Sequence, residues 1–161
     1  MNYPKEQSAA FTGHRFISAQ ELLGIKEQLN VIIRGAYAHG IRNFYCGMAI
    51  GFDMFCAQAI CDLRTELPDI RLTAVVPFRK QSERFTDSQK SRYDRLLSAA
   101  DDVIILNEDF HKGCYMQRNN YMVDRSNLII AYSKGAIKGG TYHTCKRAKS
   151  KGIPIINLCL L

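Results

Sequence analysis

The stretch IRNFYCGMAIGFD, residues 41–53, carries the pattern that decides the fold. Residues 41–46 are a stretch of strand length that ends in Phe44, Tyr45 and Cys46, and Gly47 and Gly51 then bracket a turn. From Phe52 onward the apolar residues recur at helical spacing. A buried strand, a glycine turn and an amphipathic helix in direct succession are typical of a β–α unit in a parallel sheet.

The same alternation extends along the whole chain. We expect strands over residues 9–12, 41–46, 70–76, 102–106, 128–132 and 153–158, and helices over residues 18–40, 52–63, 87–99, 115–125 and 141–151. Ser18 and Glu21 form a capping-box signature, and the run Val103-Ile104-Ile105-Leu106 is typical of a strand that is covered on both faces. The sequence therefore predicts a single Rossmann-like α/β domain over residues 1–161, with three α/β/α layers and a mostly parallel sheet of about five to six strands.

Composition narrows the class of protein. The chain has 161 residues, of which 47% are hydrophobic and 23% charged, and this is ordinary globular usage that excludes wholesale disorder. No run approaches ~20 consecutive apolar residues, so we expect no membrane-spanning helix. The first residues contain no apolar signal-peptide core, and we expect a cytoplasmic protein.

The six cysteines show no CxxC or CxxxC pair, and a zinc site needs closely spaced ligands. We therefore expect no metal site, and we expect most cysteines to be buried, reduced, small apolar residues. Cys114 stands in a polar stretch and is the one that we expect to be exposed.

The formal net charge of +7 favours anionic partners. A small phosphate-bearing ligand and a nucleic acid both fit this charge, and so does the absence of any specific partner. The positive residues are dispersed, so the charge does not choose between these readings.

Unusual residues cluster just after the expected strands. Ligands of open parallel sheets bind at the carboxyl ends of the strands, so these residues should line one edge. They are Thr12, Gly13, His14 and Arg15 after the first strand, residues 47–53 after the second, Pro77 and Arg79 after the third, and Gly139, Gly140 and Thr141 after the fifth.

Two of these loops suggest phosphate binding. Gly47 and Gly51 permit positive φ and let a phosphate approach the backbone at a helix start, where free N–H groups attract anions. Asp53 would cap that helix or accept a hydrogen bond from a ribose hydroxyl. Gly139 and Gly140 would expose backbone N–H donors in the same way before the last helix, where Thr141 would cap the helix or bind phosphate. A plain turn with a favourable helix start is the alternative for each loop.

Side chains add candidates for the same edge. Arg15 and Arg79 suit bidentate phosphate binding, although exposed surface arginines would look the same. His14 is either an acid/base or a simple loop residue. The helix at residues 115–125 places Arg118, Tyr121 and Asp124 near one face, with the candidate Asn119 next to Arg118 in the chain, and its alternative is a half-exposed amphipathic helix.

The order of these motifs resembles the YpsA-like family of the SLOG superfamily of Rossmann-like domains. The resemblance rests on residues 12–15, the glycine loop that ends in Asp53, residues 76–78, and the stretch 118–124, and it covers almost the whole chain. The loop at 47–53 is also similar to the glycine loop of DprA/Smf proteins, which bind single-stranded DNA. The loop at 138–141 is similar to that of LOG-type proteins, which cleave nucleotide N-glycosidic bonds. These resemblances imply a nucleotide or nucleotide-derived ligand, such as an ADP-ribose-like molecule, and imply no reaction by themselves.

One departure bears on catalysis. The LOG-type loop continues into a catalytic glutamate, whereas Gly140 is followed here by Thr141, Tyr142 and His143. The resemblance therefore implies a ligand-binding sensor or regulatory domain, in which the bound nucleotide alters a contact with a partner protein or a homo-oligomer. A nucleotide N-glycosidic or phosphate hydrolase that uses His14, Asp53 or Asp124 is the alternative. Single-stranded nucleic-acid binding in the DprA manner is a second alternative.

Overall fold

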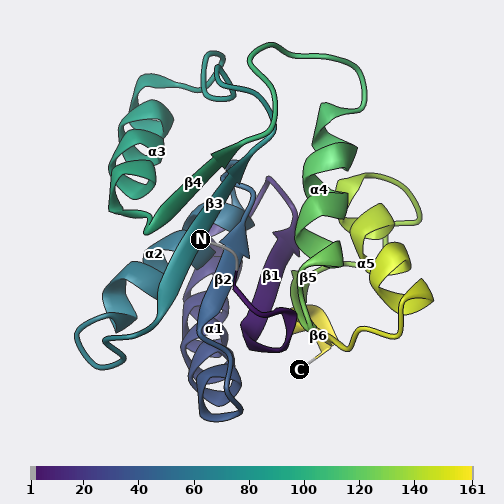
Figure 1. Cartoon of the computed structure of the whole chain (residues 1–161). Helices are drawn as coiled ribbons and strands as arrows, with labels where there is room; N and C mark the ends of the chain where they lie inside the picture. Colours follow the sequence, from purple (N-terminus) through teal and green to yellow (C-terminus); the bar gives the residue numbers. More distant parts are fainter. Residues whose placement is uncertain (1–2, 161) are drawn as a thin grey trace.

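The computed structural model describes residues 3–160, which form six strands, five α-helices and two short 3-10 turns (Figure 1). The strands are β1 (Ser8–Gly13), β2 (Asn43–Cys46), β3 (Arg71–Val76), β4 (Asp102–Ile105), β5 (Leu128–Tyr132) and β6 (Ile155–Asn157). The helices are α1 (Ala19–Ala38), α2 (Phe52–Leu63), α3 (Asp87–Ala99), α4 (Cys114–Asp124) and α5 (Gly140–Ser150), and the 3-10 turns are Lys5–Gln7 and Leu158–Leu160.

The strands form one parallel sheet in the order β4-β3-β2-β1-β5-β6. From β1 the chain moves outward through β2 and β3 to β4, and it then returns to the opposite side of β1 for β5 and β6. The strand order therefore reverses between β1 and β5. Connections leave these two neighbouring strands in opposite directions, which opens a crevice at their carboxyl ends.

Helices cover both faces of the sheet, as the sequence predicts. Helices α1, α2 and α3 pack on one face around Phe11 and Phe44, while α4 and α5 pack on the other around Ala10 and Ile129 (Figure 1). Successive residues of a strand face opposite sides, so Ala10 and Phe11 belong to different cores. The structure confirms the three-layer Rossmann-like α/β fold.

Some expected details differ. Ser18 Oγ accepts a hydrogen bond from the Glu21 N–H at 3.2 Å, but the Glu21 carboxylate does not complete a capping box, because it accepts hydrogen bonds from the Ser18 hydroxyl, Tyr132 and Lys134 and not from the Ser18 N–H. Cys114 is buried, so the expectation that it is exposed was wrong. It begins α4 directly after Gly113, whose φ of +91° turns the chain inward.

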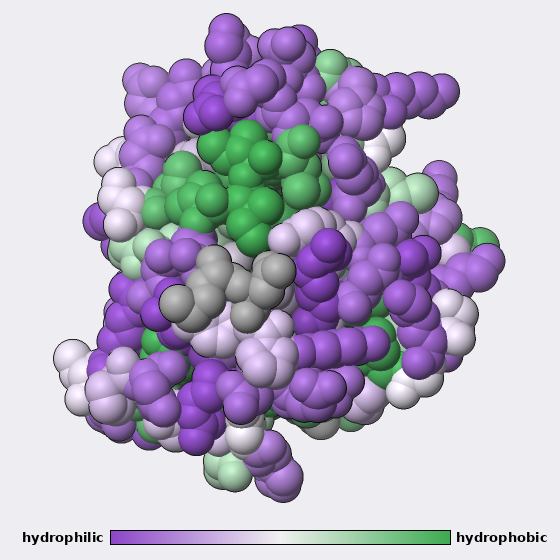
Figure 2. Space-filling model, in the orientation of Figure 1, coloured by the Kyte–Doolittle hydropathy of each residue, from purple (hydrophilic) through white to green (hydrophobic). Residues whose placement is uncertain are grey.

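The edge strand β4 is less covered than its sequence suggests. Val103 is 42% exposed, and Ile104, Ile105 and Leu106 are only partly buried. Figure 2 shows apolar side chains gathered on the surface at this end of the sheet. An apolar run therefore marked a strand correctly here, but it did not show that helices shield both faces of that strand.

Candidate functional site

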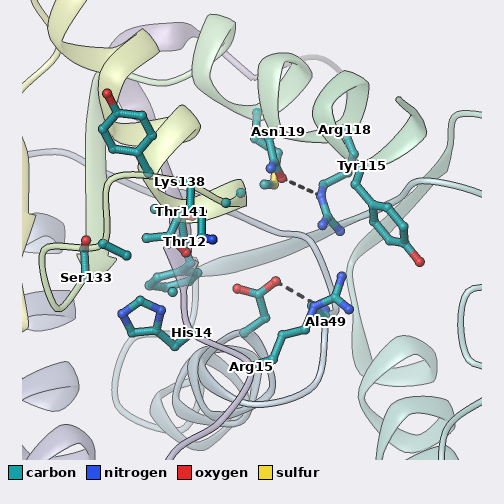
Figure 3. A pocket seen from close by; sticks show the side chains of 18 residues that line it. Thr12, His14, Arg15, Ala49, Tyr115, Arg118, Asn119, Ser133, Lys138 and Thr141 are labelled. Carbon is teal, nitrogen blue, oxygen red and sulfur yellow. Dashed lines mark hydrogen bonds between the residues drawn. The ribbon is translucent and has the colours of Figure 1, made fainter. Parts of the chain in front are cut away.

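A cavity of about 440 Å³ lies at the crevice between β1 and β5. Its walls come from the loops that follow these two strands, from the first turn of α5 and from one side of α4. In Figure 3, Arg118 and Asn119 reach the cavity from α4, whereas His14 and Arg15 reach it from the loop after β1. Of the residues singled out in the sequence, the lining contains Thr12, Gly13, His14, Arg15, Asp53, Arg118, Asn119, Gly139, Gly140 and Thr141.

The start of α5 offers unused hydrogen-bond donors to this cavity. Gly139 has a φ of +99° and no side chain caps the helix. Within residues 3–160, the backbone N–H groups of Gly140 and Thr141 have no hydrogen-bond partner. Thr141 lies in the first turn rather than at the cap, so its expected capping role was wrong. The helix dipole and these free donors favour an anion at this point, and Lys138 beside them adds positive charge.

Arg118 is a buried cation at the opposite wall. Its side chain is 5% exposed, its Nη1 donates to the Gly47 carbonyl, and its Nε donates to Asn119 Oδ1 at 2.8 Å. In the part of the chain that the structure describes, Nη2 has no hydrogen-bond partner. The guanidinium is therefore held in place by two of its nitrogens, and the third keeps its donor capacity.

Gly47 makes room for this arginine. A Cβ at position 47 would lie 2.5 Å from Arg118 Nη1, so any side chain there would displace the guanidinium. Gly47 does not line the cavity. The sequence drew attention to Gly47 as a place where phosphate approaches the backbone, and the structure shows a side chain of the protein itself in that space.

Gly51 has a similar structural role. Its φ is +86°, and a Cβ there would lie 2.2 Å from the Arg15 carbonyl oxygen. The Phe52 N–H at the start of α2 donates to the His14 carbonyl at 3.0 Å. The loop after β1 therefore packs against the start of α2, and Gly51 lies outside the cavity lining. The first N–H of α2 is therefore already bonded to the protein, whereas those of Gly140 and Thr141 at the start of α5 are not, within residues 3–160.

Asp53 is a buried carboxylate on the lining. It is 7% exposed and accepts a hydrogen bond from the Ala49 N–H at 3.2 Å. Burial raises the pKa of Asp53, while Arg118, the Ala49 N–H and Arg15 act in the opposite direction. The cavity thus combines an acceptor with cationic and N–H donors.

We expect Asp53→Asn to raise the midpoint of thermal unfolding at about pH 7. When folding raises the pKa of a carboxyl group, the protein loses stability as the pH rises from the ordinary pKa to the raised one. Asparagine stays neutral, so the variant avoids this loss. The difference between the two proteins should vanish below the ordinary carboxyl pKa, at about pH 3. Scanning calorimetry at both pH values checks this, and an asparagine variant that melts lower at neutral pH would contradict it.

His14 is held in one tautomer. Its Nε2 accepts a hydrogen bond from the Lys134 N–H at 2.9 Å, so in the neutral ring the proton is on Nδ1. Burial lowers the pKa of His14, the Lys134 charge lowers it further, and Glu21 opposes them. Glu21 in turn binds Tyr132 and Lys134, and these hydrogen bonds lower its pKa to about 2. His14 is therefore a neutral hydrogen-bond donor with its other nitrogen occupied.

Three further predicted residues lie away from the cavity lining, besides Gly47 and Gly51. Arg79 is exposed and forms a bidentate ion pair with Glu108, with both N–O distances at 2.7 Å. The Pro77 carbonyl accepts a hydrogen bond from Asn107. Asp124 faces Arg147 of α5 and Lys151 directly after that helix, and their hydrogen bonds lower its pKa to about 2.

Asp124 joins α4 to α5, and we expect Asp124→Asn to lower the free energy of unfolding by about 1 kcal/mol at neutral pH. A carboxylate with a lowered pKa contributes stability above its ordinary pKa and loses it as the pH falls toward 2. Urea unfolding at neutral and acidic pH should show the difference shrinking in acid. A difference that persists unchanged at low pH would mean that the ion pairs are not its cause.

Sequence reasoning missed several lining residues. Tyr115 lies under Arg15, whose guanidinium carbon is 5.2 Å from the ring centroid, and Lys138, Ser133 and Tyr142 also line the cavity. Ser133 and Lys138 follow β5, so their position at a strand end was a usable signal. Tyr115 faces the cavity because of how α4 packs, which the sequence pattern does not encode.

Comparison with known proteins agrees with this fold. The model of the YspA SLOG family matches residues 16–155. The SPbeta prophage-derived protein YoqJ of Bacillus subtilis is 28% identical over 141 residues, which are 80% of this chain and 82% of YoqJ. UPF0398 protein RBAM_020340 of Bacillus velezensis is 23% identical over 147 residues, covering 88% of this chain and 81% of that protein.

Two solved structures of DNA processing protein A (DprA) share the architecture. The protein from Streptococcus pneumoniae superposes with a TM-score of 0.63 at 18% identity, over 95% of this chain and 49% of DprA. The protein from Helicobacter pylori gives a TM-score of 0.63 at 17% identity, over 94% of this chain and 64% of DprA. This chain therefore corresponds to only part of either DprA, and the likeness concerns the fold.

Proposed function

We propose that this chain, which belongs to the YspA SLOG family, binds a nucleotide or nucleotide-derived ligand in the cavity between β1 and β5 and acts as a sensor or regulatory domain. The observation that carries the proposal is the pair of unused anion donors at one cavity. Arg118 presents a free Nη2 from α4, and Gly140 and Thr141 present free N–H groups from α5. Two separate helices, α4 and α5, thus supply hydrogen-bond donors that suit phosphate.

The remaining lining suits the rest of a nucleotide. Asp53 offers an acceptor for a ribose hydroxyl, and His14 offers a donor from Nδ1. Tyr115 and Tyr142 supply aromatic surface for a base. A volume of about 440 Å³ falls within the usual range of small-molecule sites, ~300–1,000 Å³.

Binding is favoured over hydrolysis by the acid/base groups present. Asp53 is the one carboxylate among the described lining residues, and the first turn of α5 continues as Thr141, Tyr142 and His143. Asp124 is engaged by Arg147 and Lys151 outside the lining. A hydrolase would need a second positioned acid or base within hydrogen-bond reach of the scissile bond, and His14, which also lines the cavity, has its Nε2 occupied by the Lys134 N–H. Hydrolysis therefore stays the alternative, with Asp53 as its residue to test.

The DprA likeness supports an extended version of this ligand. The Helicobacter pylori structure is described as showing a single-stranded DNA binding mode. The net charge of +7 is compatible with a short DNA strand as well as with a free nucleotide.

A thermal-shift screen tests the proposal. The purified protein is heated with AMP, ADP, NAD, ADP-ribose and an oligothymidylate of about four nucleotides. A ligand at 100 times its dissociation constant adds about 2.7 kcal/mol of stability, which is a readable shift for a domain of this size. Stabilisation by at least one compound is expected, and the same mixtures are then analysed for cleavage products. If none of the compounds stabilises the protein, the proposal fails, whereas cleavage products would favour the hydrolase alternative.

A further inference from the structure

A second depression lies on the opposite face, over helices α1, α2 and α3. It has a volume of about 420 Å³, with α2 as its floor and α1 and α3 as its walls. A neighbouring hollow of about 280 Å³ shares Met54, Phe55 and Arg92 with it. That hollow also includes Arg15, which lines the cavity described above. We call the two hollows together the α2 groove, and we call the cavity between β1 and β5 the nucleotide cavity. Arg15 lines both.

The α2 groove combines cations with aromatic rings. Lys26 Nζ lies 5.9 Å from the centre of the Phe55 ring, and the guanidinium carbon of Arg92 lies 5.8 Å from the same ring. Phe55 is partly exposed between them. Toward the nucleotide cavity, the hollow is lined by Phe16, which is 82% exposed, and by Arg15.

These cations are not neutralised by the protein. Among residues 3–160, neither Lys26 nor Arg92 has a carboxylate within 4.0 Å. The acidic residue of the groove, Asp62, accepts a hydrogen bond from Gln58 at 2.8 Å, and Gln58 accepts one from Arg95. The part of the groove around Phe55 is therefore left with a net positive charge.

We propose that the α2 groove binds single-stranded nucleic acid, with a base stacked on Phe55 and the flanking phosphates at Lys26 and Arg92. A ring between two cations matches a base between two phosphates, and proteins bind single strands in this way without reading their sequence. An acidic peptide would satisfy the cations but would leave the ring without a stacking partner. The link through Arg15 to the nucleotide cavity rests on the proposed function, whereas strand binding at Phe55 does not.

Fluorescence anisotropy with a labelled oligothymidylate of about 12 nucleotides tests the α2 groove. Lys26→Ala/Arg92→Ala is expected to weaken binding at least tenfold at low salt and to flatten the slope of log K against log salt by about 1.4, at about 0.7 per phosphate. Phe55→Leu, which keeps an apolar side chain, is expected to weaken binding at least fivefold without changing that slope. The control Lys146→Ala/Lys149→Ala removes the same charge from exposed positions on α5 and should change the affinity less than twofold.

Two outcomes overturn the proposal. One is that the wild-type protein does not bind the strand, or that the α5 control loses as much affinity as the groove variant. The other is that polyglutamate of equal charge displaces the labelled strand fully and Phe55→Leu binds the strand as tightly as the wild type does. That result would mean that the strand is held by charge attraction alone, without base stacking. The α2 groove variants should keep the thermal shift with AMP or ADP-ribose. Strand binding that the α2 groove variants lose, with no thermal shift from AMP, ADP, NAD or ADP-ribose, would retain the groove and remove the support for a free nucleotide in the cavity, and the reverse result would reject only the groove.

Discussion

Gly51→Ala is expected to lower the free energy of unfolding by about 2 to 6 kcal/mol. The φ of Gly51 is +86° and its ψ is −129°, a conformation that costs an L-residue about 1–3 kcal/mol. The new Cβ would also lie 2.2 Å from the Arg15 carbonyl oxygen, and overpacking against backbone costs about 1–3 kcal/mol more. Either the loop after β1 or the start of α2 has to move.

Urea unfolding measures this change, and the chain contains a matched control. Gly24 lies inside α1, is exposed, and has no atom within 4 Å of the position that a Cβ would take. Gly24→Ala should therefore stabilise the protein by about 0.8–1 kcal/mol, because alanine favours a helix over glycine. A loss below about 1 kcal/mol for Gly51→Ala would mean that the loop after β1 does not pack on α2 as described.

Arg118→Met is expected to weaken binding of AMP or ADP-ribose by about tenfold to a hundredfold. Methionine keeps an unbranched apolar side chain in the buried site but removes the charge and the free Nη2 donor. A hydrogen bond to a charged group contributes about 1.5–3 kcal/mol, which corresponds to this range. Arg118→Lys should restore little, because a single ammonium cannot bind Gly47, Asn119 and a ligand in a planar fork.

Isothermal titration calorimetry measures this loss, with Arg79→Met as its control. Arg79 was a candidate of equal standing in the sequence, but it is exposed and paired with Glu108 outside the cavity lining. Its removal should leave the affinity within about twofold, since exposed ion pairs contribute little. Equal losses in the two variants would indicate general charge attraction rather than a site built around Arg118.

Sequence patterns predicted the fold because they report burial and chain reversal. The strand at Leu128–Tyr132 and the helix at Asp87–Ala99 lie where the periodicity placed them. The parallel order followed from the alternation of strands and helices, and it brought Thr12, Arg15 and Gly140 to one edge. Motifs far apart in the chain could therefore be assigned to one region.

The roles of individual residues were harder to predict, because they depend on packing between distant segments. Position 47 requires a glycine because the side chain of Arg118, which is 71 residues away in the sequence, occupies the space that a Cβ would need. Arg79 follows a strand as the other candidates do, but Glu108 from the next strand end holds it at the surface. A motif indicates that a glycine or an arginine is needed, whereas only the structure shows what it touches.

We propose that an anionic group of a bound nucleotide lies between Arg118 and the start of α5. Amide NMR spectra of the isotope-labelled protein, titrated with ADP-ribose and separately with AMP, test it most directly. We expect the largest shift changes at the N–H groups of Gly140 and Thr141 and at the guanidinium N–H groups of Arg118, with saturation at one common affinity. Shift changes confined to other parts of the molecule would contradict this placement. So would the absence of shift changes at a ligand concentration that saturates a site with a millimolar dissociation constant.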